Sequence, residues 1–190
     1  MNDPAPGGRP HAPARDLGDI HLRTSLRPGD IGRVVQLHGL LYSRECGYDH
    51  TFEAYVASPL AQFARNDSVH ERIWLAERGD RLVGCIAILA ASPDVAQLRW
   101  FLVDPSERGA GLGRHLMDQA IAFSHAQGYH SIVLWTVSGL IAAAHLYRAA
   151  GFRKIAENPG HLWGRDVVEE QYELSPVPPS PHWSRGRRPA

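Results

Sequence analysis

Apolar and polar residues follow each other along this chain with two different periods, which predict strands and helices in succession. Val34, Leu37 and Leu41 recur at the spacing of one helix face. The uninterrupted apolar run at residues 82–90 is instead typical of a buried strand. Gly79-Asp80 separates this run from the strand before it, as the turn of a β-hairpin does.

The whole pattern predicts one domain at residues 20–174 of the 190-residue chain, with no internal repeat. Strands are expected at residues 22–26, 73–77, 82–90, 95–103, 131–136, 152–156 and 167–174. Helices are expected at residues 31–44 and 52–65, from the glycines near residue 111 to about residue 127, and at 141–149. A loop containing His161 is expected between the last two strands. The proline-rich segments 1–19 and 175–190 are expected to be disordered or flexible tails.

The rest of the chain is organised around residues 97–127. A strand rich in aromatic and β-branched residues ends at Asp104-Pro105, because proline cannot donate to a strand ladder. The glycine-rich loop Arg108–Gly113 follows, and an amphipathic helix begins there. Apolar residues mark one face of that helix at positions 112, 116, 120 and 123.

A strand that ends in glycines at the start of a helix is suited to binding phosphate. The N–H groups of the first helical turn have no intrahelical partner, and the helix dipole adds positive charge there. Glycine lets the backbone approach a ligand closely, so the loop is expected to accept a phosphate or pyrophosphate. Arg108 and Arg114 add cationic side chains on either side of it.

Three kinds of phosphate loop compete for this pattern. A P-loop ends in Gly-Lys-Ser/Thr, whereas this loop ends Gly113-Arg114-His115. A dinucleotide fingerprint has G-x-G-x-x-G early in the fold and an acidic residue about 20 positions later, and neither is present. The third pattern, R-x-x-G-x-G, is formed by Arg108, Gly111 and Gly113. It resembles the pyrophosphate loop of the GNAT family, the GCN5-related N-acetyltransferases.

A second motif supports the resemblance, which covers roughly residues 22–174. Leu146-Tyr147 and Gly151-Phe152 form L-Y-x-x-x-G-F, which is similar to the later helix and following strand of that family. The resemblance implies an α/β fold with a central mixed, mostly antiparallel twisted sheet of six to seven strands. Helices would cover both faces, and the fourth and fifth strands would splay apart in a V. The segments YSRECGYDHTFE, LWT and HLWG look most similar to acetyltransferase modules often fused to MarR-type regulators.

The resemblance also implies a chemistry: acetyl-CoA as co-substrate, no metal, and an amine of a small molecule or protein as acceptor. CoA would bind the backbone of Phe101, Leu102 and Val103 and the loop Arg108, Gly109, Ala110, Gly111, Leu112, Gly113 and Arg114. Tyr147 matches the tyrosine that acts as general acid in many relatives. A phenol with an ordinary pKa of about 10 is protonated at neutral pH and can donate to a departing thiolate.

The sequence leaves open which residue acts as the general base. Trp135 stands where some relatives carry a glutamate, and Leu140 stands where many carry an asparagine. Glu45 and His38 are the candidate bases, and a proton path through water is the alternative. The acceptor wall is expected to include His38, Tyr42, Tyr48, Arg99, Trp135 and His161, with Glu45 as a further substrate contact.

Composition limits the partners. The formal net charge of zero implies neither nucleic acid nor an anionic membrane as a partner. No run reaches the roughly 18 apolar residues of a membrane span, and no secretory signal is recognisable, so a cytoplasmic location is expected. Two distant cysteines give neither a disulfide framework nor a zinc site. The resemblance also allows a homodimer.

The leading hypothesis is an acetyl-CoA-dependent N-acetyltransferase in which the amine attacks directly in a ternary complex. The alternative is a non-catalytic acyl-CoA-binding sensor or regulatory module. A nucleotide-binding domain, which would prefer ATP or NAD to CoA, is a third hypothesis.

Overall fold

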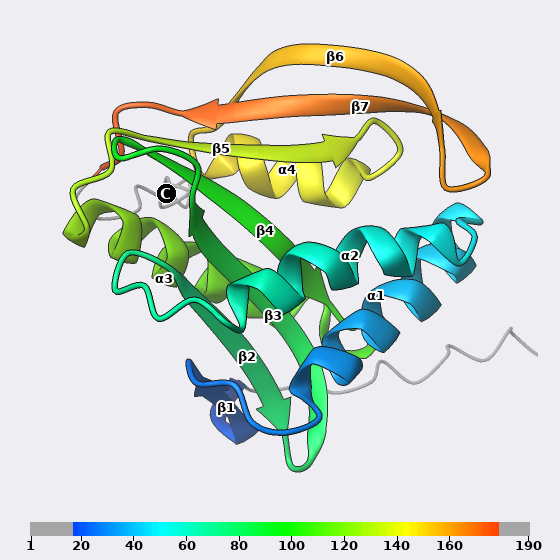
Figure 1. The fold of residues 1–190 in the computed structure, drawn as a ribbon, viewed down its shortest axis with the longest axis horizontal. Coiled ribbons are helices and arrows are strands. Elements are labelled where there is room, and N and C mark those ends of the chain that lie inside the picture. The colour runs from blue at the N-terminus through cyan, green and yellow to red at the C-terminus, as the bar shows by residue number, and fades with distance from the viewer. Residues whose placement is uncertain (1–16, 179–190) are drawn as a thin grey trace, which may run out of the picture.

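The computed structural model describes residues 17–178, which contain a seven-stranded sheet in the order β1-β2-β3-β4-β5-β7-β6 (Figure 1). The strands are β1 (Ile20–Arg23), β2 (Arg72–Arg78), β3 (Arg81–Ala90), β4 (Val95–Val103), β5 (Ser131–Val137), β6 (Arg153–Leu162) and β7 (Arg165–Leu174). The helices are α1 (Asp30–Cys46), α2 (Thr51–Phe63), α3 (Leu112–Ala126) and α4 (Ile141–Ala149), with short 3-10 turns at Leu17–Asp19 and Pro105–Glu107. Only β4 and β5 pair in parallel, so the predicted mixed and mostly antiparallel sheet is confirmed.

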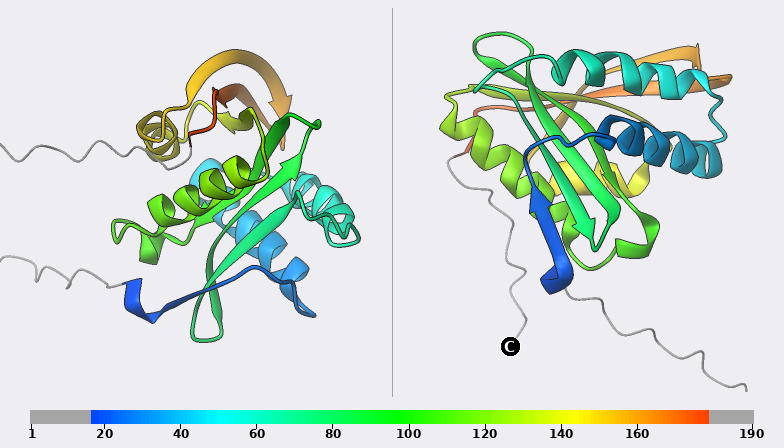
Figure 2. Two further views of the ribbon diagram at one scale, coloured as in Figure 1. Left: turned by 90° about the vertical axis from the view of Figure 1, so that its left-hand side faces the viewer. Right: turned by 60° about the horizontal axis from the view of Figure 1, so that its bottom comes forward.

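Helices cover both faces of the sheet, and each face has its own core (Figures 1 and 2). On one face, α3 packs Leu116 and Ile121 against strand residues such as Ile86, and α4 adds Ala144 and Tyr147. On the other face, α1 and α2 pack Val34 and Leu60 against the sheet. The helix face predicted from positions 112, 116, 120 and 123 is buried as expected.

β4 and β5 run together only at their beginnings and then diverge. Their pairing is limited to Val95–Gln97 against Ser131–Val133, and Figure 1 shows the two strands spreading apart beyond it. β4 pairs with β3 on its other side as far as Val103. The edge of β4 that faces β5 is therefore open from residue 98 onward, which confirms the predicted splay.

A β-bulge interrupts β4 within this open region. Between the pairs Cys85–Leu102 and Ala87–Arg99, the two residues Trp100 and Phe101 stand opposite one residue of β3. Trp100 has the left-handed φ of 49°, and the Cys85 thiol donates to its carbonyl at 3.0 Å. Such a bulge changes which face the following side chains point to. Arg99 and Trp100 consequently both lie on the α1–α2 face, although they are consecutive in the strand.

The end of the chain differs from the sequence-based expectation. The predictions of a short strand at 152–156 and of a loop containing His161 were wrong. β6 continues to Leu162, and His161 pairs with Asp166 of β7. Trp163 and Gly164 form the two-residue turn, and both have positive φ, as a type I′ hairpin turn requires. Nearly every residue of β6 is exposed, so the strand carries no alternation of apolar and polar residues to predict it.

The first strand was also misplaced, since it covers residues 20–23 rather than 22–26. The strand ends at Arg23, whose buried guanidinium binds Asp30 at 2.7 Å and Glu77 at 2.9 Å. This pairing attaches the start of α1 to β1 and β2. The ends of the other predicted helices and strands fall within two residues of the observed ones.

Most of the two predicted tails, at residues 1–16 and 179–190, lies outside the described residues. Val177 is buried against the α3–α4 core, and its N–H donates to His130 O at 3.0 Å. No helix of the described region is both long and apolar enough to cross a membrane. Residues 17–178 also contain no cluster of His, Cys, Asp and Glu that could hold a metal ion.

Candidate active site

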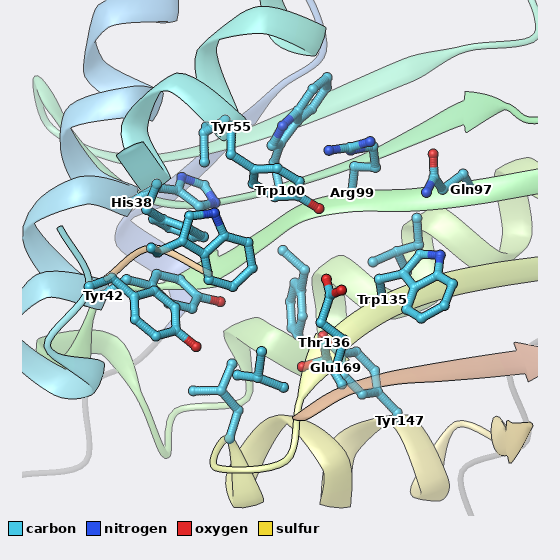
Figure 3. A pocket seen from close by; sticks show the side chains of 18 residues that line it. His38, Tyr42, Tyr55, Gln97, Arg99, Trp100, Trp135, Thr136, Tyr147 and Glu169 are labelled. Carbon is cyan, nitrogen blue, oxygen red and sulfur yellow. The ribbon is translucent and has the colours of Figure 1, made fainter. Parts of the chain in front are cut away.

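Two cavities meet where β4 and β5 diverge. The first, here called the loop groove, is lined by Leu41, Tyr42, Glu45, Phe101, Leu102, Val103, Glu107, Arg108, Gly109, Ala110, Gly111, Gly113, Arg114, Gly139, Leu140, Ile141, Ala142, Ala143 and Leu146. The second, the aromatic cavity, is lined by His38, Tyr42, Tyr48, Phe52, Tyr55, Val56, Gln97, Leu98, Arg99, Trp100, Phe101, Trp135, Thr136, Val137, Leu140, Tyr147, Trp163 and Glu169 (Figure 3). Tyr42, Phe101 and Leu140 belong to both, so a ligand in the groove can reach a ligand in the cavity.

The glycine loop forms one end of the loop groove. Gly109 and Gly111 have φ values of 83° and 91°, which strain any residue with a Cβ. Gly111 caps α3, and its carbonyl accepts the first helical hydrogen bond, from the N–H of His115. Backbone N–H groups at the start of α3 are thus turned toward the groove without an intrahelical partner. These groups and the helix dipole make the loop suitable for an anion.

An ion pair crosses the loop groove. Arg108 binds Glu45 with both terminal guanidinium nitrogens, Nη1 and Nη2, at 2.9 and 3.0 Å, and its Nε donates to the Val103 carbonyl at 3.2 Å. Glu45 lies in the last turn of α1, so the pair connects α1 to the glycine loop. Both side chains are partly exposed. A phosphate that binds Arg108 directly therefore competes with Glu45.

The open edge of β4 forms the wall of the groove. Phe101, Leu102 and Val103 line it, and within residues 17–178 no strand pairs with this edge beyond Gln97. Gly113 faces the same wall, because a Cβ there would lie 3.4 Å from the ring of Phe101. An extended chain with amide groups can add to such an edge as another strand would.

Aromatic rings enclose the second cavity. Tyr42 and Phe52 pack with ring centroids 4.5 Å apart, and Trp163 lies 4.9 Å from Tyr48 and 5.1 Å from Tyr55. Trp163 comes from the β6–β7 turn, and its carbonyl accepts the Asp49 N–H at 3.0 Å. The hairpin thus reaches over the end of α1 and closes one side of the cavity.

His38 is part of the buried wall and is neutral. Burial lowers its pKa to about 4, although the hydrogen bond to the Val34 carbonyl opposes this shift. Nδ1 lies 2.8 Å from that carbonyl and donates to it, which leaves Nε2 unprotonated. His38 Nε2 and Trp100 Nε1 are the two buried side-chain polar atoms of the described residues that have no partner. Buried polar groups without a partner are unusual in a folded protein.

Tyr147 reaches the aromatic cavity from α4. Tyr147 is 5% exposed, and its ring centroid lies 6.1 Å from that of Phe101, which lines both cavities. Burial raises the pKa of Tyr147 far above its ordinary value, and a hydrogen bond with the Thr136 hydroxyl opposes part of the rise. Burial also strongly raises the pKa of Tyr42. Both phenols are therefore proton donors throughout the physiological range.

One charged residue of the cavity was missed by the sequence analysis. Glu169 lies on β7 opposite Val137, and Figure 3 shows it beside Thr136 and Tyr147. The next residue, Glu170, is turned to the other face and binds Lys154 and Tyr172. The only available signal was that side chains of this strand point alternately to the two faces of the sheet. Which residues point into the cavity becomes known only with the register of the sheet.

The structure separates the predicted catalytic and acceptor-side residues into three groups. His38, Tyr42, Tyr48, Arg99, Trp135 and Tyr147 all line the aromatic cavity. Glu45 lies in the loop groove instead, bound to Arg108. His161 lines neither cavity, because it is exposed on the hairpin and its Nδ1 lies 2.7 Å from Asp166.

Comparison with known proteins assigns the family. The model of the acetyltransferase (GNAT) family matches residues 39–152. The chain belongs to the GNAT family. It is 33% identical over 137 residues to an uncharacterized N-acetyltransferase of Schizosaccharomyces pombe, which covers 70% of this chain and 83% of that protein. It is also 32% identical to human N-acetyltransferase 8B, over 50% of this chain and only 44% of the length of the human protein.

Solved structures share the fold of this GNAT chain. An acetyltransferase from Streptococcus agalactiae superposes with a TM-score of 0.68 at 22% identity, covering 83% of this chain and 98% of that one. Spermidine N-acetyltransferase from Vibrio cholerae, in complex with CoA and spermine, superposes with a TM-score of 0.64 at 19% identity. The match covers 84% of this chain and 96% of that one. The mixed sheet with helices on both faces is therefore the GNAT fold.

Proposed function

We propose that this GNAT protein is an N-acetyltransferase that moves an acetyl group from acetyl-CoA to a primary amine by direct attack. The observation that supports this most strongly is the junction of the two cavities at Phe101. A groove suited to a long phosphorylated ligand opens there into a cavity that contains a proton donor, Tyr147. A protein that only sensed acyl-CoA would have no need for this second cavity.

The loop groove has the features that a CoA molecule needs. The pyrophosphate would lie against the N–H groups of the Gly109–Arg114 loop, with Arg108 and Arg114 beside it. The amide groups of the pantetheine arm would pair with the open edge of β4 at residues 101–103. When bound, acetyl-CoA supplies the activated acetyl group as a thioester.

Three groups of this chain would then assist the transfer. Tyr147 would donate its hydroxyl proton to the departing sulfur, since its raised pKa keeps it protonated. A backbone N–H of the bulged part of β4 would stabilise negative charge on the carbonyl oxygen. Glu169, the only carboxylate among the described residues that line the aromatic cavity, would accept the proton of the amine. Glu45 is less suited to this step, because it lies in the groove and binds Arg108.

The names of the relatives do not decide the acceptor. One structural neighbour acts on spermidine, and N-acetylaspartate synthetase of Xenopus tropicalis is 33% identical over only 33% of its own length. A polyamine and an acidic amino acid carry opposite charges, so neither can be transferred to this chain. The kinship with modules fused to MarR-type regulators likewise stays a prediction.

Release of free CoA, measured with purified protein, acetyl-CoA and a panel of primary amines, tests the proposal. We expect saturable, acceptor-dependent release that Tyr147→Phe reduces by about ten-fold or more. Bound CoA without turnover on any amine would contradict catalysis and support an acyl-CoA sensor. Preference for ATP or NAD over CoA would contradict the whole assignment.

A further inference from the structure

The aromatic cavity contains two side chains of opposite charge, and neither has an ion-pair partner among the described residues. Among the described residues that line it, Arg99 and Glu169 are the only acidic or basic side chains besides the neutral His38. Neither forms an ion pair with any residue of the described part of the chain. Arg99 and Glu169 are half-buried, whereas fully buried charges of the fold, such as Arg23 and Glu107, are paired.

Arg99 is held in place by rings rather than by a carboxylate. Its guanidinium carbon lies 5.4 Å from the ring centroid of Tyr55 and 5.8 Å from that of Trp100. The bulge of β4 places Arg99 and Trp100 on the same face, so the cation and its ring support point into the cavity together. A guanidinium that is fixed in this way and has no anion can bind a carboxylate with two hydrogen bonds.

Glu169 faces the cavity from the opposite wall. It comes from β7, whereas Arg99 comes from β4, and Figure 3 shows the cavity between the two side chains. Glu169 lies beside Thr136 and Tyr147, on the side where the proposed chemistry takes place. An ammonium group of the acceptor would bind Glu169. An amine held at Glu169 would face the junction with the loop groove.

The remaining wall is mostly aromatic, with a few polar groups such as those of Gln97 and Thr136. Tyr48, Phe52 and Trp163 close it on one side, and the 37% exposed Trp135 lies at its rim. A flat apolar body gains more from such a wall than a polar or flexible one, through burial and ring stacking. A linear diamine has two cations, but the cavity offers a single carboxylate and a repelling arginine.

We infer that the preferred acceptor is a zwitterion with an aromatic or bulky apolar body, an aromatic α-amino acid being the simplest example. Arg99 binds the carboxylate of this acceptor, Glu169 binds its amine, and the rings of the cavity hold its body. This inference rests on the proposed acetyl transfer and deepens it by naming the acceptor class.

Three acceptors test the inference in the CoA-release assay: phenylalanine, 2-phenylethylamine, which lacks the carboxylate, and 1,5-diaminopentane. We expect kcat/KM for phenylalanine to exceed that for 2-phenylethylamine by about ten-fold or more, since a charged hydrogen-bonded pair is lost. The ratio of the two values should fall toward one in Arg99→Gln. Arg65→Gln, at an exposed arginine beyond α2, is the matched control and should keep the ratio of the wild type.

Two results would overturn the inference while leaving acetyl transfer intact. One is turnover of the diamine or of 2-phenylethylamine at least as efficient as that of phenylalanine. The other is a phenylalanine preference that survives Arg99→Gln. Absence of CoA release with every acceptor would instead overturn the proposed function, and this inference with it.

Discussion

Arg108 and Glu45 form a bidentate ion pair across the groove in which we place CoA, with N–O distances of 2.9 and 3.0 Å. The pair links the last turn of α1 to the glycine loop. In this pair, the Arg108 guanidinium that a pyrophosphate needs is already bound to a carboxylate. Glu45 also adds a negative charge beside the expected position of that phosphate. The pair is therefore both a bridge between two walls of the groove and a competitor of the ligand.

Glu45→Gln should strengthen CoA binding. Removal of the carboxylate frees Arg108 and removes repulsion of the phosphates. Because partly exposed ion pairs contribute little, we expect an increase of about two- to five-fold in affinity. Titration calorimetry with CoA measures this change, and Glu157→Gln on the distant β6 serves as the control. Weaker binding in Glu45→Gln would show that Glu45 helps to hold the ligand.

Tyr147→Phe should lower kcat by about ten-fold or more and leave CoA affinity within about two-fold. The hydroxyl lost in this variant reaches the aromatic cavity, and the ring that packs against Phe101 is kept. Tyr42→Phe is the matched comparison, because Tyr42 is a second phenol at the junction with a raised pKa. A larger loss of kcat in Tyr42→Phe would transfer the role of proton donor to Tyr42.

The raised pKa of Tyr147 also predicts the alkaline side of the pH–rate profile. A phenol with an ordinary pKa of about 10 would begin to lose its proton above pH 9, and the rate would fall. Burial keeps Tyr147 protonated there, so we expect no such decline between pH 8 and about 10. The Tyr147→Phe variant, measured at saturating substrates, should likewise show no decline in rate over that pH range. A decline in the wild type alone would contradict the raised pKa.

His38 makes stability depend on pH. Its pKa is about 4 in the folded protein and about 6.5 when unfolded, so acid favours the unfolded state. The stabilisation is complete above pH 6.5 and is lost as the pH falls from 6.5 to about 4. The shift corresponds to about 3 kcal/mol. Urea unfolding at pH 7.5, 6 and 5 should show a smaller pH dependence in His38→Gln than in the wild type, and an equal dependence would contradict this role.

Arg23→Met should destabilise the fold by about 3–5 kcal/mol, because it leaves the buried Asp30 and Glu77 with only the partly exposed Arg33 as a cationic partner. Urea unfolding at neutral pH measures the loss. Arg44→Met, at an exposed position of α1, is the control and should change stability by less than about 0.5 kcal/mol. A similar small effect for Arg23→Met would mean that the buried carboxylates are not held by this residue.

The sequence predicted the part of the site that depends on local rules. Proline at 105 and the glycines at 109 and 111 determine where the strand ends and α3 begins, and these effects act within a few residues. The predicted positions of α3 and of Tyr147 followed from them, together with the resemblance to the GNAT family. The predicted strand 95–103 agrees with β4 residue for residue.

The features that the sequence did not predict depend on contacts between distant segments. The bulge at Trp100 exists only relative to β3, and the inward direction of Glu169 depends on the register of β7 against β5. β6 is held by its pairing with β7 and not by an apolar face of its own. Each of these features shapes the aromatic cavity, so the acceptor side was harder to predict than the loop groove.

Titration calorimetry with CoA tests the central claim, that the glycine loop at the start of α3 binds the pyrophosphate. We expect saturable binding to the wild type and a loss of at least about ten-fold in Gly111→Glu, which adds a carboxylate beside the expected phosphate. Gly128→Glu is the matched control, because Gly128 has a similar φ of 81° at the other end of the same helix. CoA binding that is absent in the wild type, or equal in both variants, would contradict the account.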